Sequence, residues 1–368
     1  MIAGEDVPSD HCQAMPDNPP SRVMSLKKPL HRQTHGLIAQ PSAMASGFAP
    51  GKCILFGEHA VVYGHPAVAV AIDSGVRVSV ERSNEWTLEG IPFEPSRHPH
   101  ISHILNAVFE YEGPPLKMEV ESNLFSAAGL GSSAALSNAI GAALQAHINP
   151  GQSLDPISLA RMGHSAEAMA QKGRASPTDT ATSALGGCIV VSGQPVDGTK
   201  HVFDAELETP EGIREWSINS VDLPDSLREA YLVIGFTGEM SSTGKMVADV
   251  AKRLERHPEL REEMNSIGRI TSAGLTAMSA GNLEAVGMAM DACHGKLRLL
   301  GVSSPSLESL VEAARPHSLG AKLTGSGGGG CMIALARDPQ RVAEAIEVVG
   351  GRPLISRLGA PGVRLLED

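Results

Sequence analysis

The sequence has little of what nucleic-acid-binding and secreted proteins commonly use. Aromatic residues make up only 3% of its 368 residues, and the formal net charge is −11 without a dense run of lysine or arginine. An acidic surface repels the phosphates of nucleic acids and of anionic membranes, so we expect neither as a partner. The five cysteines form no CxxC pair and are odd in number, which favours reduced thiols and a cytoplasmic location.

Long hydrophobic runs are also missing. No apolar segment approaches the roughly 20 residues that a membrane-spanning helix needs, and residues 1–45 lack the apolar centre of a secretory signal. Those first residues are rich in proline, serine and histidine, so we expect a disordered N-terminal extension. With 42% hydrophobic residues, the chain as a whole can bury a substantial core.

Strand patterns dominate the first half of the chain and helical patterns the second. Residues 67–83 alternate valine with smaller residues and predict two strands joined by a turn near Ser74–Gly75. Asp155–Pro156 is a typical helix start, with an acidic cap followed by proline. Further strands are expected at 116–122, 229–236, 320–323 and 331–335, and helices at 155–173, 244–300, 305–315 and 339–349. This order predicts an α+β protein with two lobes.

The first stretch with residues suited to catalysis or ligand binding is "APGKCILFGEHAVVYG" (49–64). Pro50–Gly51 predicts a turn directly before Lys52, and Glu58 and His59 fall in a second turn. A cation, a carboxylate and an imidazole at the ends of strands would suit acid–base or phosphate chemistry. Ordinary surface residues at turns would give the same pattern.

The stretch "GLGSSAALSNAIGAAL" (129–144) combines glycines with the start of an apolar helix. Ser132 and Ser133 fall where unpaired backbone N–H groups favour an anion, and a serine hydroxyl can also bind Mg²⁺. Gly129, Gly131 and Ala134 also match the dinucleotide fingerprint at three points. A close-packed alanine and glycine helix is a third interpretation. A Walker loop, GxxxxGK[ST], does not occur in the sequence.

The stretch "AKLTGSGGGGCMIAL" (321–335) has five glycines in six positions. Glycine loses more backbone entropy on folding than other residues, so such a run indicates close approach to a ligand or another loop. A flexible hairpin turn is the alternative. Upstream, "SPTD" places Asp179 in a Thr- and Ser-rich turn after a helix that carries Glu167. One of these two carboxylates could bind a metal ion while the other acts as a general base.

The segment "HPHISH" supplies three histidines, His98, His100 and His103, in a spacing that could hold a metal. No cysteine, aspartate or second cluster has an evident place beside them. The segment also runs directly into the apolar residues "ILNAVF". We therefore favour the start of a surface helix here over a metal site.

Three motifs of the chain together resemble the signature of the GHMP kinases: "PGK…GEHAVVYG", "GLGSSAA" and "TGSGGGG". This family of small-molecule kinases includes galactokinase, homoserine kinase, mevalonate kinase and phosphomevalonate kinase. Within the family, the mevalonate kinase branch is most similar to three longer stretches: "GKCILFGEHAVVYGHPAVAVAI", "ASPTDTATSALGG" and "KLTGSGGGGCMIAL". The resemblance spans about residues 46–366. It implies an α+β fold with an N-terminal lobe like ribosomal protein S5 domain 2 (46–225) and a ferredoxin-like C-terminal lobe (226–368). The active-site cleft would lie between them, and the last strand could return to the first lobe.

The resemblance also implies an activity, the phosphorylation of the C5 hydroxyl of mevalonate by ATP and Mg²⁺, in a homodimer. The family's catalytic residues fall on Asp179, as the base, and on Lys52. Its metal ligands fall on Ser133 and Glu167. The ATP-binding residues would be Ser122, Ala127, Ala128, Gly129, Leu130, Gly131, Ser132 and Ser133. The substrate-binding residues would be Lys52, Glu58, His59, Asp179, Thr243 and Ser326.

The sequence departs from the family pattern at three places, one of which is an extra residue between Glu167 and Asp179. "LFSAAGLGSSAA" lacks the proline usual before the glycines, and Ser326 replaces an alanine beside the substrate site. The alternatives that stay open are a sister kinase acting on phosphomevalonate or another alcohol, and a non-catalytic sensor with the same fold. A dinucleotide dehydrogenase is disfavoured, because its fingerprint should open the first βαβ unit instead of following some 80 strand-rich residues.

Overall fold

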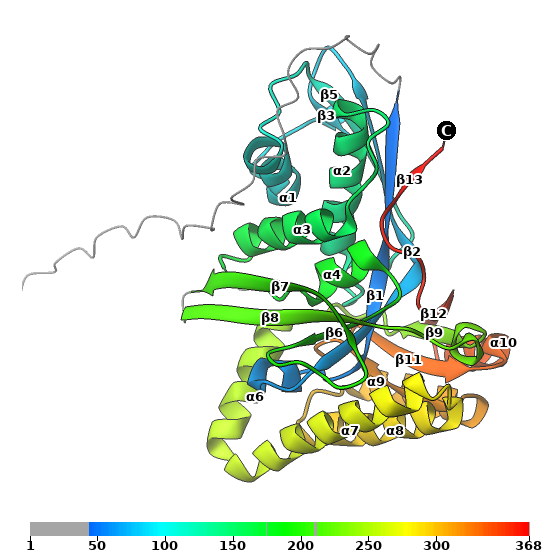
Figure 1. Ribbon diagram of the computed structural model, residues 1–368. Helices are drawn as coiled ribbons and strands as arrows, with labels where there is room; N and C mark the ends of the chain where they lie inside the picture. The colour runs from blue at the N-terminus through cyan, green and yellow to red at the C-terminus, as the bar shows by residue number, and fades with distance from the viewer. Residues whose placement is uncertain (1–43, 174, 210–211, 368) are drawn as a thin grey trace, which may run out of the picture.

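The structure is a computed structural model, and it describes residues 44–173, 175–209 and 212–367 (Figure 1). The expected extension at residues 1–45 therefore lies almost entirely outside the described residues. The chain folds into two sheets, each with helices packed on it, which confirms the α+β prediction.

The first sheet has nine strands, eight of which come from residues 45–221. Its strands are β1 (Ala45–Phe56), β2 (Ala67–Arg82), β3 (Thr87–Leu88), β4 (Ile91–Pro92), β5 (Leu116–Ser122), β6 (Cys188–Ser192), β7 (Lys200–Thr209), β8 (Gly212–Val221) and β13 (Arg364–Leu366). Most follow the order β4-β3-β5-β2-β6-β8-β7, while β1 pairs with both β2 and β13. The last strand of the chain thus lies antiparallel to the first.

The second sheet has four strands in the order β10-β11-β9-β12. Their bounds are β9 (Tyr231–Phe236), β10 (Gly320–Thr324), β11 (Cys331–Ala336) and β12 (Arg352–Arg357). All neighbouring strands in this sheet are antiparallel. The strands expected at 229–236, 320–323 and 331–335 are confirmed to within two residues.

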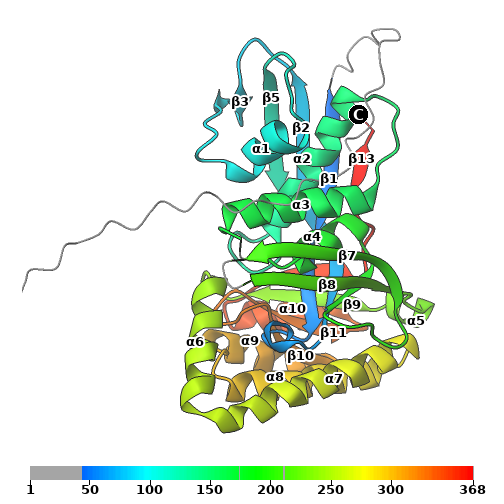
Figure 2. The ribbon, with the colours of Figure 1, turned by 60° about the vertical axis from the view of Figure 1, so that its left-hand side comes forward.

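Helices cover both sheets (Figures 1 and 2). The N-terminal half contributes α1 (Pro99–His103), α2 (Ser132–Ile148), α3 (Pro156–Ala170) and α4 (Thr178–Leu185), with α2 packed on β1 and β2. The C-terminal half contributes α5 (Asp225–Arg228), α6 (Thr243–Arg256), α7 (Arg261–Ser279), α8 (Leu283–Leu299), α9 (Pro305–Ala314) and α10 (Pro339–Val348). The expected cap of α3 is confirmed, because Asp155 Oδ1 accepts a hydrogen bond from the Ile157 N–H at 3.1 Å.

The prediction of two strands within residues 67–83 is wrong, because β2 is one continuous strand. Gly75 is paired with Pro50 of β1 instead of forming a turn. A Cβ atom at Gly75 would lie 2.2 Å from the carbonyl oxygen of Ala49. The glycine therefore allows β1 and β2 to approach closely, a need that its sequence position does not distinguish from a turn.

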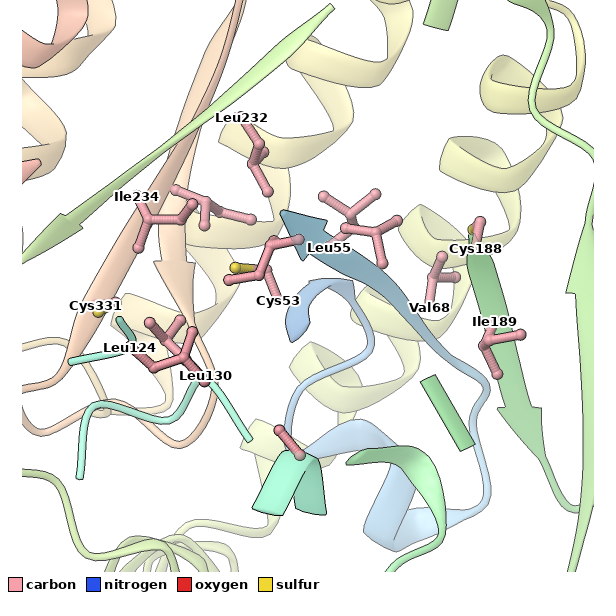
Figure 3. Close-up of a cluster of buried hydrophobic side chains, with 14 of the residues drawn as sticks. Cys53, Leu55, Val68, Leu124, Leu130, Cys188, Ile189, Leu232, Ile234 and Cys331 are labelled. Carbon is pink, nitrogen blue, oxygen red and sulfur yellow. The ribbon is translucent and has the colours of Figure 1, made fainter. Parts of the chain in front are cut away.

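The two sheets share one hydrophobic core. Figure 3 shows Leu55 of β1 and Ile234 of β9, from different sheets, in one cluster of buried side chains. Polar contacts also join the sheets: Thr324 Oγ1 accepts a hydrogen bond from the Ile54 N–H at 2.9 Å and donates one to the Ile54 carbonyl at 3.0 Å. These two bonds join β1 of the first sheet to the end of β10 of the second.

Candidate functional site

Lys52 of β1 joins three of the stretches singled out in the sequence. Its backbone N–H donates to the Leu130 carbonyl at 2.9 Å, and its Nζ donates to the Gly129 carbonyl at 3.0 Å. The same Nζ lies 3.1 Å from Asp179 Oδ1. The Lys52 side chain is only 4% exposed, whereas that of Asp179 is 40% exposed. A shielded cation therefore supports a carboxylate that solutes can reach.

The loop between β5 and α2 is anchored by its leucines. Leu124 and Leu130 are buried in the core beside Cys53 and Cys331, as Figure 3 shows. Between these anchors, the backbone of Gly129 is exposed. The loop is thus tied to the core although residues 123–131 contain no proline.

Gly131 is the residue before α2, and it occupies a place where only glycine fits well. Its φ of 73° is in the left-handed region. A Cβ atom there would lie 3.1 Å from Lys52 Cγ and 3.6 Å from Asp179 Oδ2. The next two residues, Ser132 and Ser133, form the first turn of α2, as predicted. The unpaired N–H groups of this turn and the helix dipole favour an anion beside Lys52.

The glycine run between β10 and β11 closes on this loop. A Cβ atom at Gly330 would lie 3.1 Å from the Ala128 carbonyl oxygen, and one at Gly325 would lie 3.9 Å from Gly129 Cα. Ser326 is held from two sides: His59 Nε2 donates to its carbonyl at 2.9 Å, and its hydroxyl lies 2.9 Å from the Ser241 hydroxyl. The run is packed against another loop, so the alternative of a free hairpin is not supported.

The prediction that Asp179 lies in a turn is wrong, because Asp179 is in the first turn of α4. Thr180 Oγ1 donates to the Pro177 carbonyl at 3.2 Å, and Thr182 Oγ1 donates to the Thr178 carbonyl at 2.7 Å. The threonine hydroxyls are thus satisfied within the helix itself, although the composition of the segment is typical of turns. The position of Asp179 is therefore set by a helix and not by a loop.

Glu167 is buried on α3 with one oxygen free. Its Oε2 accepts a hydrogen bond from Gln171, while Oε1 has no hydrogen-bond partner among the described residues. Burial raises the pKa of Glu167, but the neighbouring His100, Ser133 and Gln171 side chains favour the charged form more strongly and hold the pKa below its usual value. An ionised carboxylate with a free oxygen near a serine hydroxyl is a donor set that suits Mg²⁺.

Glu58 differs from the sequence expectation of a residue facing substrate and phosphate. Its carboxylate is fully buried and forms an ion pair with Lys322 of β10, and Cys293 Sγ lies 3.9 Å away. Burial raises the pKa of Glu58 in spite of the nearby Lys322. The pair links the turn after β1 to strand β10 of the second sheet. Sequence reasoning missed Lys322, although a lysine inside the apolar strand "GAKLT" requires a buried partner.

The remaining predicted residues lie around this centre. His59 has a left-handed φ of 58°, and burial lowers its pKa. Thr243 is exposed as the first residue of α6, two residues after Ser241. Ser122 is exposed at the end of β5, and its hydroxyl accepts a hydrogen bond from the Leu124 N–H at 3.3 Å. Ser241 was missed because a lone serine carries no sequence signal.

The histidine segment starts a helix, as favoured from the sequence: α1 begins at Pro99 with His98 as its cap. His103 Nε2 lies 2.8 Å from Ser165 Oγ of α3, and His100 Nε2 lies 3.4 Å from Glu167 Oε1. No helix in the described ranges is both long and apolar enough to cross a bilayer.

Comparisons with known proteins agree with this geometry. Residues 99–187 match the model of the GHMP kinase N-terminal domain, and residues 275–353 match that of the GHMP kinase C-terminal domain. The chain is 34% identical to a mevalonate kinase of Thermococcus sibiricus, over 86% of this chain and 97% of that protein. It is 33% identical to a mevalonate kinase of Pyrococcus furiosus, over 87% of this chain and 97% of that one. A crystal structure of the Methanococcus jannaschii mevalonate kinase superposes with a TM-score of 0.68 at 24% identity, over 88% of this chain and all of that one.

Proposed function

Since this chain belongs to the GHMP kinase family, among its mevalonate kinases, we propose that it transfers the γ-phosphoryl group of ATP to the C5 hydroxyl of mevalonate. The observation that carries the proposal is the Lys52–Asp179 pair, 3.1 Å apart, at the N-terminus of α2. A carboxylate, a cation and a lining of N–H donors are the groups that phosphoryl transfer requires.

Asp179 is the proposed general base. Its exposed carboxylate accepts the proton of the C5 hydroxyl as the hydroxyl oxygen forms a bond to the γ-phosphorus and the bond to the departing ADP oxygen breaks. Lys52 keeps Asp179 in place through their 3.1 Å contact and adds positive charge near the phosphoryl group. Because Lys52 also bonds the Gly129 carbonyl, it links the position of the base to that of the phosphate loop.

The phosphates of ATP are proposed to bind along residues 127–133, with Ser122 nearby. The first turn of α2 supplies unpaired N–H groups, and Gly129 and Gly131 let the phosphates approach the backbone. Thr243, His59 and Ser326 are the proposed substrate contacts. Ser326 belongs to the glycine run that packs on the phosphate loop, and His59 donates a hydrogen bond to its carbonyl. Glu58 is left out of this set, since it is buried against Lys322.

Ser133 and Glu167 are the proposed Mg²⁺ ligands. The free Oε1 of Glu167 and the exposed hydroxyl of Ser133 fit an ion that takes oxygen donors. Bound there, Mg²⁺ would neutralise charge on the phosphate oxygens. Cytoplasmic location and a homodimer are also proposed. The free, buried thiols of Cys53, Cys188 and Cys293 support the first, and light scattering would test the second.

Replacing the base tests the mechanism. Asp179→Asn should lower kcat with mevalonate by about 10²–10⁴-fold, while ATP binding, measured by fluorescence titration, stays within about threefold. Asp249→Asn, on the exposed surface of α6, is the matched control and should leave both values unchanged. Near-normal turnover of Asp179→Asn would overturn the assignment of the base. A wild-type chain that binds ATP but turns over no alcohol would instead favour a non-catalytic sensor.

A further inference from the structure

His100 is the residue of the histidine segment that faces the proposed metal site. It lies on α1, which packs against α3, the helix that carries Glu167 (Figures 1 and 2). His100 Nε2 is 3.4 Å from Glu167 Oε1, and the two side chains are 20% and 6% exposed. Neither of these atoms has a hydrogen-bond partner among the residues described. Two buried polar atoms that face each other in this way call for an explanation.

The Glu167 carboxylate is otherwise held on one side only. Gln171, one turn further along α3, donates to Oε2. A carboxylate held through one oxygen can still rotate about its last side-chain bond, because that torsion has broad minima. A donor on the second oxygen removes this freedom. Each carboxylate oxygen accepts two hydrogen bonds, so an N–H on Oε1 leaves a second lone pair for a metal ion.

We propose that His100 is a positioning residue for the metal site, whose Nε2–H fixes the Glu167 carboxylate so that Oε1 is presented toward Ser133. The inference rests on the proposed assignment of Ser133 and Glu167 as Mg²⁺ ligands. Residues that orient a metal ligand raise metal affinity without touching the ion, and their removal typically weakens it about 10–100-fold. His100 therefore acts on metal affinity and not on the binding of metal-free nucleotide.

His103 provides a matched control on the same helix. It is one turn after His100, and it also reaches α3, but its Nε2 lies 2.8 Å from the hydroxyl of Ser165. Replacing His103 removes an imidazole between the same two helices and leaves the Glu167 contact in place. A loss caused only by poorer packing of α1 on α3 would therefore appear in both variants.

The test uses the full chain with ADP, Mn²⁺ as the probe for Mg²⁺, and electron paramagnetic resonance to count free Mn²⁺. His100→Ala should weaken Mn²⁺ binding about tenfold or more, and His103→Ala less than twofold. His100→Gln, whose amide can donate, should recover part of the loss. If the alanine variant does not fold, His100→Leu replaces it. Metal-free ADP affinity, measured by calorimetry, should stay the same in all of them.

Three results would overturn the role of His100: Mn²⁺ affinity of His100→Ala within twofold of wild type, an equal loss in His103→Ala, or no recovery in His100→Gln. Glu167→Gln separates this failure from failure of the metal site itself. If Glu167→Gln loses Mn²⁺ binding while His100→Ala does not, only the positioning role is wrong. If Glu167→Gln binds Mn²⁺ normally, the proposed ligand is wrong and the role of His100 falls with it.

Discussion

The buried ion pair between Glu58 and Lys322 predicts how strongly the protein depends on one lysine. The two side chains are 1% and 0% exposed; Glu58 follows β1 of the first sheet, and Lys322 lies in β10 of the second. Lys322→Met keeps most of the side-chain volume and removes the charge, which leaves the Glu58 carboxylate buried without a partner. Breaking such a pair costs about 3–5 kcal/mol. Whole proteins are stable by only about 5–15 kcal/mol, so the loss should be easy to measure.

The loss should also depend on pH in a defined direction. Burial already raises the pKa of Glu58 above its usual 4.5, and removing Lys322 takes away the charge that opposes this effect. The folded variant then keeps a proton on Glu58 that the unfolded chain releases above about pH 4.5. Stability therefore falls as pH rises. The deficit of Lys322→Met relative to wild type should be larger at pH 8 than at pH 5.

Urea denaturation at the two pH values measures this deficit as a shift of the midpoint. Glu58→Gln combined with Lys322→Met should recover most of the stability, because no charge is then buried. Lys117→Met, which removes an exposed lysine paired with Glu81 and Glu119, should change little. A Lys322→Met midpoint equal to that of Lys117→Met, or a deficit of the same size at both pH values, would refute the reasoning.

Two further predictions concern His294 and Gly131. Burial and the charge of Lys322 lower the pKa of His294 to about 3, so below about pH 6.5 the unfolded chain binds a proton that the folded chain does not, and stability falls with pH. His294→Gln should therefore remove about 2 kcal/mol of the stability lost between pH 7 and pH 5, measured by urea denaturation. An unchanged pH profile would contradict this. Gly131→Ala should cost about 1–2 kcal/mol in backbone strain and reduce kcat by displacing Lys52. Gly151→Ala, with φ of 84° and open space around it, should show similar strain at unchanged kcat; equal kcat in both variants would show that Gly131 is not needed beside Lys52.

Features set by neighbouring residues were predictable from the sequence. Asp155 and Pro156 fix the start of α3 through one local hydrogen bond, and the apolar helix after Gly131 begins where its serines predict. The order of the three candidate catalytic and binding stretches matches the GHMP kinase motifs, and those motifs imply the fold that the structure has. Local chemistry and motif order therefore account for most of the elements and for the location of the site.

Features set by long-range contacts were not predictable. Gly75 looks like a turn residue until β1 is placed against it, and the role of Lys322 depends on Glu58, 264 positions earlier in the chain. The approach of His100 to Glu167 likewise arises from the packing of α1 on α3. In each case the deciding contact joins segments whose separation in sequence carries no information about their distance in space.

The proposal that the chain phosphorylates mevalonate on C5 is tested most directly by phosphorus NMR of its product. The protein is incubated with mevalonate, ATP and Mg²⁺, and the proton-coupled spectrum is recorded. Phosphate on the C5 methylene should give a phosphomonoester signal split into a triplet by the two C5 protons, in step with ADP formation. A singlet would place the phosphate on the tertiary C3 hydroxyl instead. ADP formed only with phosphomevalonate or another alcohol, or no ADP with any of them, would contradict the proposal.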